Sequence, residues 1–167
     1  IESPGTAEEV SQFLTISGSK DEDPGILRVL TVYVEQATVL TYFKKFLKHH
    51  EMVPSEEVFG DYTPEEFDTL QDFSMRNARS KAVRVAFEAA GKTVERHVNG
   101  IFVTRVDPNS NFRDKLKVGD IIETIDGKSP GNTDESFEEL RDYLASLEPG
   151  HTLVLQVKRD DATMTIS

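Results

Sequence analysis

The 167-residue sequence contains no cysteine and no tryptophan. The absence of cysteine excludes a disulfide framework, a thiolate nucleophile and a cysteine-ligated zinc site. Long apolar runs are also missing, since none approaches the ~18 residues that a membrane span needs. Basic residues number 19 against 30 acidic ones, so the formal net charge is −11. We therefore expect no nucleic-acid partner, because a surface that follows a phosphate backbone needs a basic patch.

Hydrophobic residues make up 37 % of the chain, which is enough for a globular core in one large domain or two small ones. The acidic excess is spread evenly over both halves and marks neither as a charged tail. The first residues, Ile1 to Thr6, show no signal peptide. We expect the chain to begin inside a longer protein.

The N-terminal half shows two strand signals. Gln12–Ile16 and the β-branched run Ile26–Val34 predict strands, and the acidic stretch Gly18–Gly25 predicts the turn between them. Asp21 and Asp23 resemble the start of a calcium loop that lacks its closing glutamate, so we favour a plain solvated turn.

Two helices are expected before residue 92. Ala37–His50 has apolar residues at three- and four-residue spacing, which predicts an amphipathic helix. Thr63 and Pro64 are typical of a helix start, and the helix that they open can run to Gly91, the expected C-cap. One face of this helix carries small residues in its middle, which permits close approach of a neighbour.

The period changes from helix-like to strand-like at Thr93. Val94–Val98 and Ile101–Val106 flank Asn99-Gly100, a strong hairpin signal. Further strands are expected at Ile121–Ile125, Thr152–Val157 and up to Ser167, with a helix at Asp134–Leu147. The predicted fold class is α+β: a helix-rich N-terminal region with two strands, then a small curved sheet with one long helix.

The second half resembles a bacterial PDZ domain over roughly residues 90–167. The resemblance is carried by Gly100-Ile101-Phe102-Val103, Leu116-Lys117-Val118-Gly119-Asp120-Ile121-Ile122, Ile125-Asp126-Gly127-Lys128 and the closing Pro149-Gly150-His151-Thr152-Leu153-Val154-Leu155. It implies a peptide-binding sheet, with an N-terminal region at residues 1–91 and a PDZ domain at residues 92–167.

The first half carries a second resemblance. Met75–Lys92 and the opening Pro4-Gly5 are similar to the extracytoplasmic region of membrane-anchored, PDZ-containing Lon-like serine proteases of Gram-positive bacteria. This resemblance implies a single-pass membrane tether upstream of Ile1 and a Ser-Lys protease domain downstream of Ser167. It also implies a location on the extracellular face of the cell membrane.

The chain itself shows no arrangement for catalysis. Ser80 and Lys81 are adjacent, and successive helical residues do not face each other, so they cannot form a Ser-Lys dyad. His49 and His50 lack the spacing of a metal site, and His97 and His151 are more often surface residues. We expect no catalytic residue, no metal and no cofactor in these 167 residues.

Binding chemistry is expected instead at an open strand edge beside the helix at Asp134–Leu147. By the resemblance, Ala90–Thr93 forms the carboxylate-binding loop and Val94–Val98 the groove strand. Helical spacing places Phe137, Arg141 and Leu144 on one face of the opposite wall. The candidate peptide-binding residues are therefore Ala90, Gly91, Lys92, Thr93, Val94, Arg96, Phe137, Arg141 and Leu144.

The function hypothesis is substrate recognition within a membrane-tethered Lon-like endopeptidase, with an extended peptide or protein as the partner. The alternative is a non-enzymatic PDZ scaffold at the cell surface.

Overall fold

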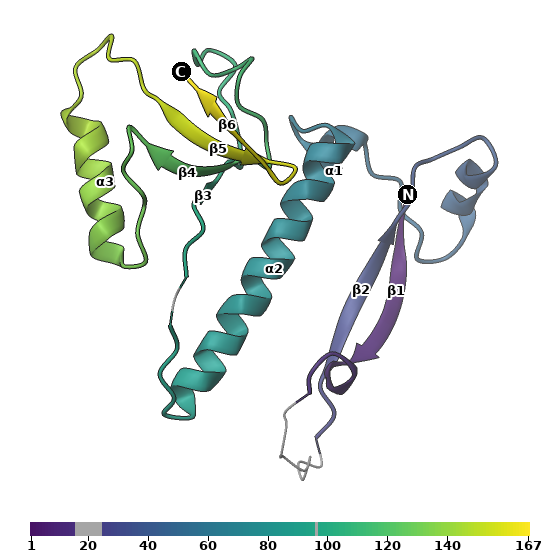
Figure 1. Ribbon diagram of the computed structural model, residues 1–167. Helices are drawn as coiled ribbons and strands as arrows, with labels where there is room; N and C mark the ends of the chain where they lie inside the picture. The colour runs from purple at the N-terminus through teal and green to yellow at the C-terminus, as the bar shows by residue number, and fades with distance from the viewer. Residues whose placement is uncertain (16–24, 96) are drawn as a thin grey trace. The chain divides into compact units, whose positions relative to one another are not determined.

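The computed structural model describes residues 1–15, 25–95 and 97–167. They form two compact units, Ile1–Asp61 and Tyr62–Ser167. The fold is α+β, as predicted: a two-stranded sheet in the first unit, and a long helix with a four-stranded antiparallel sheet in the second (Figure 1). The domain start expected at residue 92 is not tested by this division and stays a prediction. The turn with Asp21 and Asp23 lies outside the described residues.

The first unit is built on the antiparallel pair β1 (Glu2–Glu9) and β2 (Arg28–Val34). The prediction of the second strand is confirmed. The strand expected from Gln12 is wrong for its described residues, because Val10–Gln12 forms a 3-10 turn (η1) and the chain then leaves the sheet. Its place is taken by β1, whose Pro4 and Gly5 are turn formers in most sequences.

β1 accommodates Pro4 and Gly5 through a register irregularity between Pro4 and Ala7. There the Thr6 N–H donates to the Thr31 side-chain oxygen at 2.8 Å, and the Thr31 hydroxyl donates to the Thr6 carbonyl at 3.1 Å. A Cβ added to Gly5 would collide with the same hydroxyl. One threonine side chain therefore supports a strand that local sequence signals argue against.

The helix expected at Ala37–His50 is reduced to a short 3-10 helix, η2 (Thr41–Phe46). Its start is fixed by reciprocal hydrogen bonds between Thr38 and Thr41, and Leu47 already has an extended backbone. Two kinds of side chain disfavour a regular helix here. β-Branched side chains lose rotamer freedom in a helix, and threonine hydroxyls compete for hydrogen bonds with the nearby backbone. A second short helix, α1 (Ser55–Phe59), follows and was not predicted.

The long helix α2 (Pro64–Ala89) confirms its sequence signals. The Thr63 side chain accepts from the Glu66 N–H at 3.2 Å, and the Glu66 carboxylate accepts from the Thr63 N–H at 2.8 Å, a reciprocal capping box. At the other end Gly91 has φ +71°. Glycine adopts this left-handed conformation at the end of a helix with less steric strain than residues that carry a Cβ.

The four-stranded sheet of the second unit has the order β3-β4-β5-β6, all antiparallel. Its strands are β3 (Ile101–Phe102), β4 (Ile121–Ile125), β5 (Leu155–Arg159) and β6 (Ala162–Ile166), and the second helix is α3 (Asp134–Ser146). The core is a cluster of Ile125, Leu140, Leu155, Val157 and Ile166. β4 and α3 are confirmed, whereas β5 begins three residues later than expected.

The strand expected at Val94–Val98 is wrong: its described residues adopt no regular structure. Gly100 has φ +146° and does not form the left-handed hairpin turn that Asn99-Gly100 predicts. A Cβ on Gly100 would lie 2.5 Å from the Ile122 carbonyl oxygen, so the chain instead passes tightly over β4 at this point. β3 consequently pairs with β4 and not with the segment before it.

α2 is attached to this sheet through Phe73 and Phe102, whose rings are stacked with centroids 3.8 Å apart and planes at 6°. Beyond Phe73, every residue of α2 is exposed. The small-residue face of α2 is thus exposed over Ser74, Ala78, Ala82, Val85 and Ala89.

A buried ion pair ties three strands of the sheet together. Asp120 is 1 % exposed and receives two hydrogen bonds of 2.7 Å from the Arg159 guanidinium. Its carboxylate also accepts from the Lys117 N–H, and its carbonyl accepts from the Val103 N–H, both at 2.8 Å. Arg159 additionally donates to the Lys115 carbonyl at 2.8 Å. These bonds satisfy Asp120 fully, as a buried charge requires.

Arg159→Met tests this pair. Removal of the guanidinium leaves the Asp120 carboxylate buried without its partner, so the free energy of unfolding should fall by about 3 kcal/mol. Urea denaturation followed by circular dichroism measures the change. The matched control is Arg113→Met, because Arg113 is exposed and lies 3.7 Å from Asp114. It should cost about 0.5 kcal/mol or less, and an equal loss in both variants would contradict the role of the buried pair.

Candidate functional site

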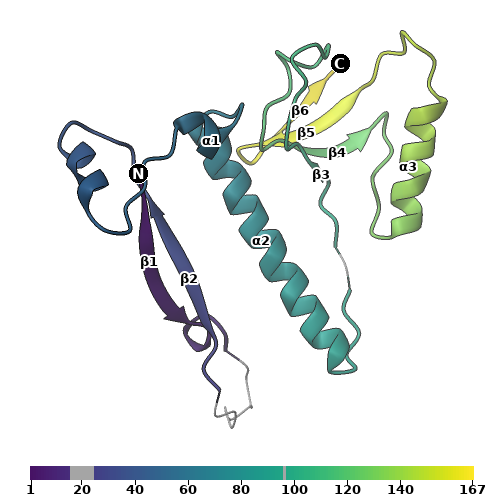
Figure 2. The ribbon, with the colours of Figure 1, turned by 180° about the vertical axis from the view of Figure 1, so that it is seen from behind.

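In the second unit, the outer edge of β3 has no strand paired with it among the described residues. Ile101 and Phe102 pair with Ile122 and Ile121 on one side only, and no other described strand adjoins β3. The segment that leads into β3 is exposed at residues 92–95 and 97 and forms no strand. In both views it runs between α2 and α3 (Figures 1 and 2). Unpaired backbone beside a helix is the arrangement to which an extended peptide can add.

One hydrogen bond joins this segment to the loop ahead of α3. The Val98 N–H donates to Asn132 Oδ1 at 2.7 Å. Asn132 stands one residue before Thr133, whose side chain accepts from the Ser136 N–H at 3.1 Å in the capping box of α3. The two walls of the candidate site are therefore connected at the N-terminal end of α3.

The predicted loop Ala90–Thr93 lies at the end of α2 and is exposed. Three of its backbone N–H groups are already used: Ala90 donates to Ala86, Gly91 to Glu88 and Lys92 to Phe87, at 2.9–3.0 Å. These are the bonds that close α2. In this conformation the loop offers few free amides to a carboxylate.

The predicted residues of α3 divide between surface and core. Phe137 is 50 % exposed and Arg141 is exposed, whereas Leu144 packs against the core cluster. Leu140, on the same helix, is 3 % exposed and belongs to the core cluster. Val94 is 36 % exposed on the segment before β3, and Arg96 lies outside the described residues. The peptide-binding role of the nine predicted residues stays a prediction.

A carboxylate network that the sequence reading missed holds α3 in place. Asp126, after β4, accepts from the Val154 N–H at 2.8 Å with one oxygen. With the other it accepts from the Tyr143 hydroxyl at 2.8 Å and lies 3.0 Å from His151 Nε2. His151 was interpreted as an ordinary surface residue, but the structure brings it to Asp126. In the sequence, Asp126 is marked by its place in the motif Ile125-Asp126-Gly127-Lys128 and His151 by its place in the closing motif, neither of which indicates that the two side chains meet.

This network shifts the pKa values of Asp126 and Tyr143. The hydrogen bond from the Val154 N–H, followed by those from Tyr143 and His151, holds the pKa of Asp126 below its ordinary value. The same carboxylate raises the pKa of Tyr143 by accepting a hydrogen bond from its hydroxyl group. The ionised form of Asp126 is thus the form that fastens α3 and the loop before β5 to the end of β4.

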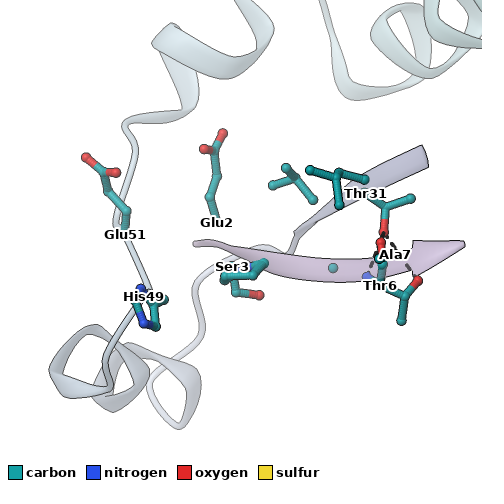
Figure 3. A pocket seen from close by; sticks show the side chains of 11 residues that line it. Glu2, Ser3, Thr6, Ala7, Thr31, His49 and Glu51 are labelled. Carbon is teal, nitrogen blue, oxygen red and sulfur yellow. Dashed lines mark hydrogen bonds between the residues drawn. The ribbon is translucent and has the colours of Figure 1, made fainter. Parts of the chain in front are cut away.

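A separate hollow of about 420 Å³ lies in the first unit, along β1 and β2 (Figure 3). Pro4, Leu30 and Val32 give it apolar walls, and the side chains of Glu2 and Glu51 lie near one end. It contains none of the predicted site residues. Among the residues that the structure describes, no group of three or more His, Asp or Glu side chains could hold a metal ion.

The comparisons with known proteins agree with the geometry of the second unit. The family model of the PDZ domain matches residues 73–167, which include most of α2, the whole four-stranded sheet and α3. Neither the search of curated proteins nor the search of solved structures found a match.

The Asp126 network predicts a pH dependence of stability. Because the pKa of Asp126 is lowered by folding, its contribution is complete above the unfolded-state value of about 3.9 and is lost as the pH falls through the folded-state value. Asp126→Asn should lower the thermal midpoint at pH 6 and flatten its decline below about pH 4. Melting curves from pH 6 to acid measure this. Asp142→Asn, on the exposed surface of α3, should keep the wild-type profile.

Proposed function

The chain belongs to the PDZ domain family, and from that membership we propose that its second unit binds extended peptides or segments of proteins. The observation that carries the proposal is the unpaired edge at β3 and its lead-in segment, connected by the Val98–Asn132 bond to the loop ahead of α3. A peptide can add to this edge with main-chain hydrogen bonds and place a side chain toward the helix.

Phe137 is the side chain best placed to supply apolar contact on that helix. It is half-exposed on the first turn of α3, beyond the capping box, so its burial by a ligand would remove apolar area from water. Arg141 lies one turn further on and can pair with a carboxylate of the ligand. Leu144 supports the wall from the core side.

The closed end of α2 favours recognition of an internal segment. The amides of Ala90, Gly91 and Lys92 donate to helix carbonyls, so a terminal carboxylate would have to compete with the bonds that end α2. Main-chain addition needs no free terminus. We therefore propose that the site accepts peptides with or without a free C-terminus.

We further propose that this peptide-binding unit serves a membrane-tethered Lon-like serine endopeptidase on the extracellular face of the cell membrane. The support is the similarity of Met75–Lys92 and Pro4-Gly5 to that family. The tether would precede Ile1, and the Ser-Lys domain would follow Ser167. Among the described residues, no helix has the length and apolarity to cross a membrane.

Phe137→Ala should weaken peptide binding by about 1–2 kcal/mol, the scale of a lost apolar contact. Phe87→Ala is the matched control, because Phe87 is 51 % exposed and belongs to α2, and not to β3 or α3. Calorimetry with a peptide selected from a library measures both variants. Substitution of Leu144 is avoided because it packs on the core.

The same peptide with an amidated C-terminus should bind with unchanged affinity. A loss of affinity on amidation would contradict the internal-segment mode and favour capture of a terminal carboxylate. If the wild-type chain and Phe137→Ala bind the peptide with equal affinity, α3 does not form part of the peptide-binding site.

A further prediction concerns catalysis. The 167-residue chain should cleave no protein or peptide, since the Ser80–Lys81 pair cannot form a dyad. Assay of the purified chain with fluorogenic peptides measures this. The codons that follow Ser167 test the proposal of a Lon-like endopeptidase. They are expected to encode a domain with a reactive serine and lysine, and the absence of such a domain would favour a PDZ scaffold without a protease.

A further inference from the structure

The two edges of the β1–β2 sheet differ in their protection. The outer edge of β1 is blocked at Glu2, which exchanges two backbone hydrogen bonds with Glu51, and at Pro4, which has no N–H. The register irregularity before Ala7 interrupts it further. These are the devices with which natural proteins prevent edge-to-edge pairing.

β2 has none of these devices. Ile1 and Glu35 exchange backbone hydrogen bonds at one end of the pair, and the Val10 N–H donates to Leu27 at the other. In an antiparallel pair, successive residues direct their N–H and C=O groups alternately toward the partner strand and away from it. Counted from these two hydrogen-bonded ends, the N–H and C=O groups of Leu30, Val32 and Val34 point away from β1. No described residue hydrogen-bonds to these outward groups. All seven residues of β2 are exposed.

The side chains around this edge are apolar. Seven large apolar residues at positions 26–34 are exposed, among them Leu30 at 81 % and Val32 at 63 %. Together they expose roughly 800 Å² of apolar surface, divided between the two faces of the strand. If two copies each cover half of it, the buried total is again roughly 800 Å², the size of a weak and reversible contact.

We propose that β2 is the dimerisation edge of this chain, pairing antiparallel with β2 of a second copy about a two-fold axis. The second copy fits because it presents the same outward N–H and C=O groups, which become complementary when the strands run in opposite directions. The charges at the two ends of β2 do not oppose this pairing, because Arg28 is already paired with Glu9 at 3.3 Å and Glu35 with Lys44 at 2.6 Å. The two β1–β2 pairs become one four-stranded sheet.

Sedimentation equilibrium of the full 167-residue chain tests the proposal. At the interface size above, we expect reversible dimers with dissociation in the micromolar range. Val32→Lys should raise the dimer dissociation constant about tenfold or more, because each dimer contains two charges at the paired edge. Met75→Lys is the matched control, since Met75 is 72 % exposed on α2, and it should leave the constant unchanged.

A second measurement does not depend on how well the lysine variant folds. The chain has no cysteine, so Val32→Cys and Met75→Cys each provide one unique thiol. Mild oxidation at micromolar concentration should cross-link Val32→Cys into dimers and leave Met75→Cys monomeric. A wild-type chain that stays monomeric up to about 200 µM overturns the proposal. So does a dimer that Val32→Lys leaves intact, or equal cross-linking of the two cysteine variants.

Discussion

The second unit depends on the buried ion pair between Asp120 and Arg159. The two residues lie at the start of β4 and the end of β5, and the same aspartate binds the backbone at Val103, where the chain leaves β3. The carboxylate of Asp120 binds Arg159 at the end of β5, and its backbone carbonyl binds Val103 after β3, so three strands meet at this one residue. A charge buried this deeply is tolerated only where its partners are fixed, so the pair sets the relative positions of the strands from which the candidate site is built.

The Asp126 network complements this pair at the opposite end of β4. It fastens α3 through Tyr143 and the loop before β5 through Val154 and His151. The helix wall of the site is thus held by polar bonds to one carboxylate as well as by Leu140 and Leu144 in the core. The lead-in segment before β3 is joined to the loop ahead of α3 by the Val98–Asn132 bond. A rigid helix wall beside unpaired backbone is an arrangement that can gain a strand without rebuilding the core.

Sequence reasoning succeeded where the decisive interactions are local. The capping box at Thr63, the glycine at position 91 and the apolar runs of β4 and β2 act within a few residues, and the structure confirms each element. It failed where partners are distant. β1 depends on the side chain of Thr31, 25 residues from Thr6, and the Asp120–Arg159 pair spans 39 residues. The alternation of Val94–Val98 indicated a strand, but pairing is decided by the neighbour, and β3 has β4 as its described neighbour.

The two units also differ in how they can be stable. Every buried apolar residue of the described chain except Ile1 belongs to the second unit, where five of them form one cluster. In the first unit, apolar side chains of β2 and η2 are exposed instead. A two-stranded sheet without a covered face is marginally stable in water, because backbone ordering costs about 1–2 kcal/mol per residue and only burial offsets it. The Ile1–Glu35 and Glu2–Glu51 hydrogen bonds fix the register of this sheet, but they add little apolar burial. Burial of the exposed edge and side chains of β2 is therefore what the first unit lacks for stability.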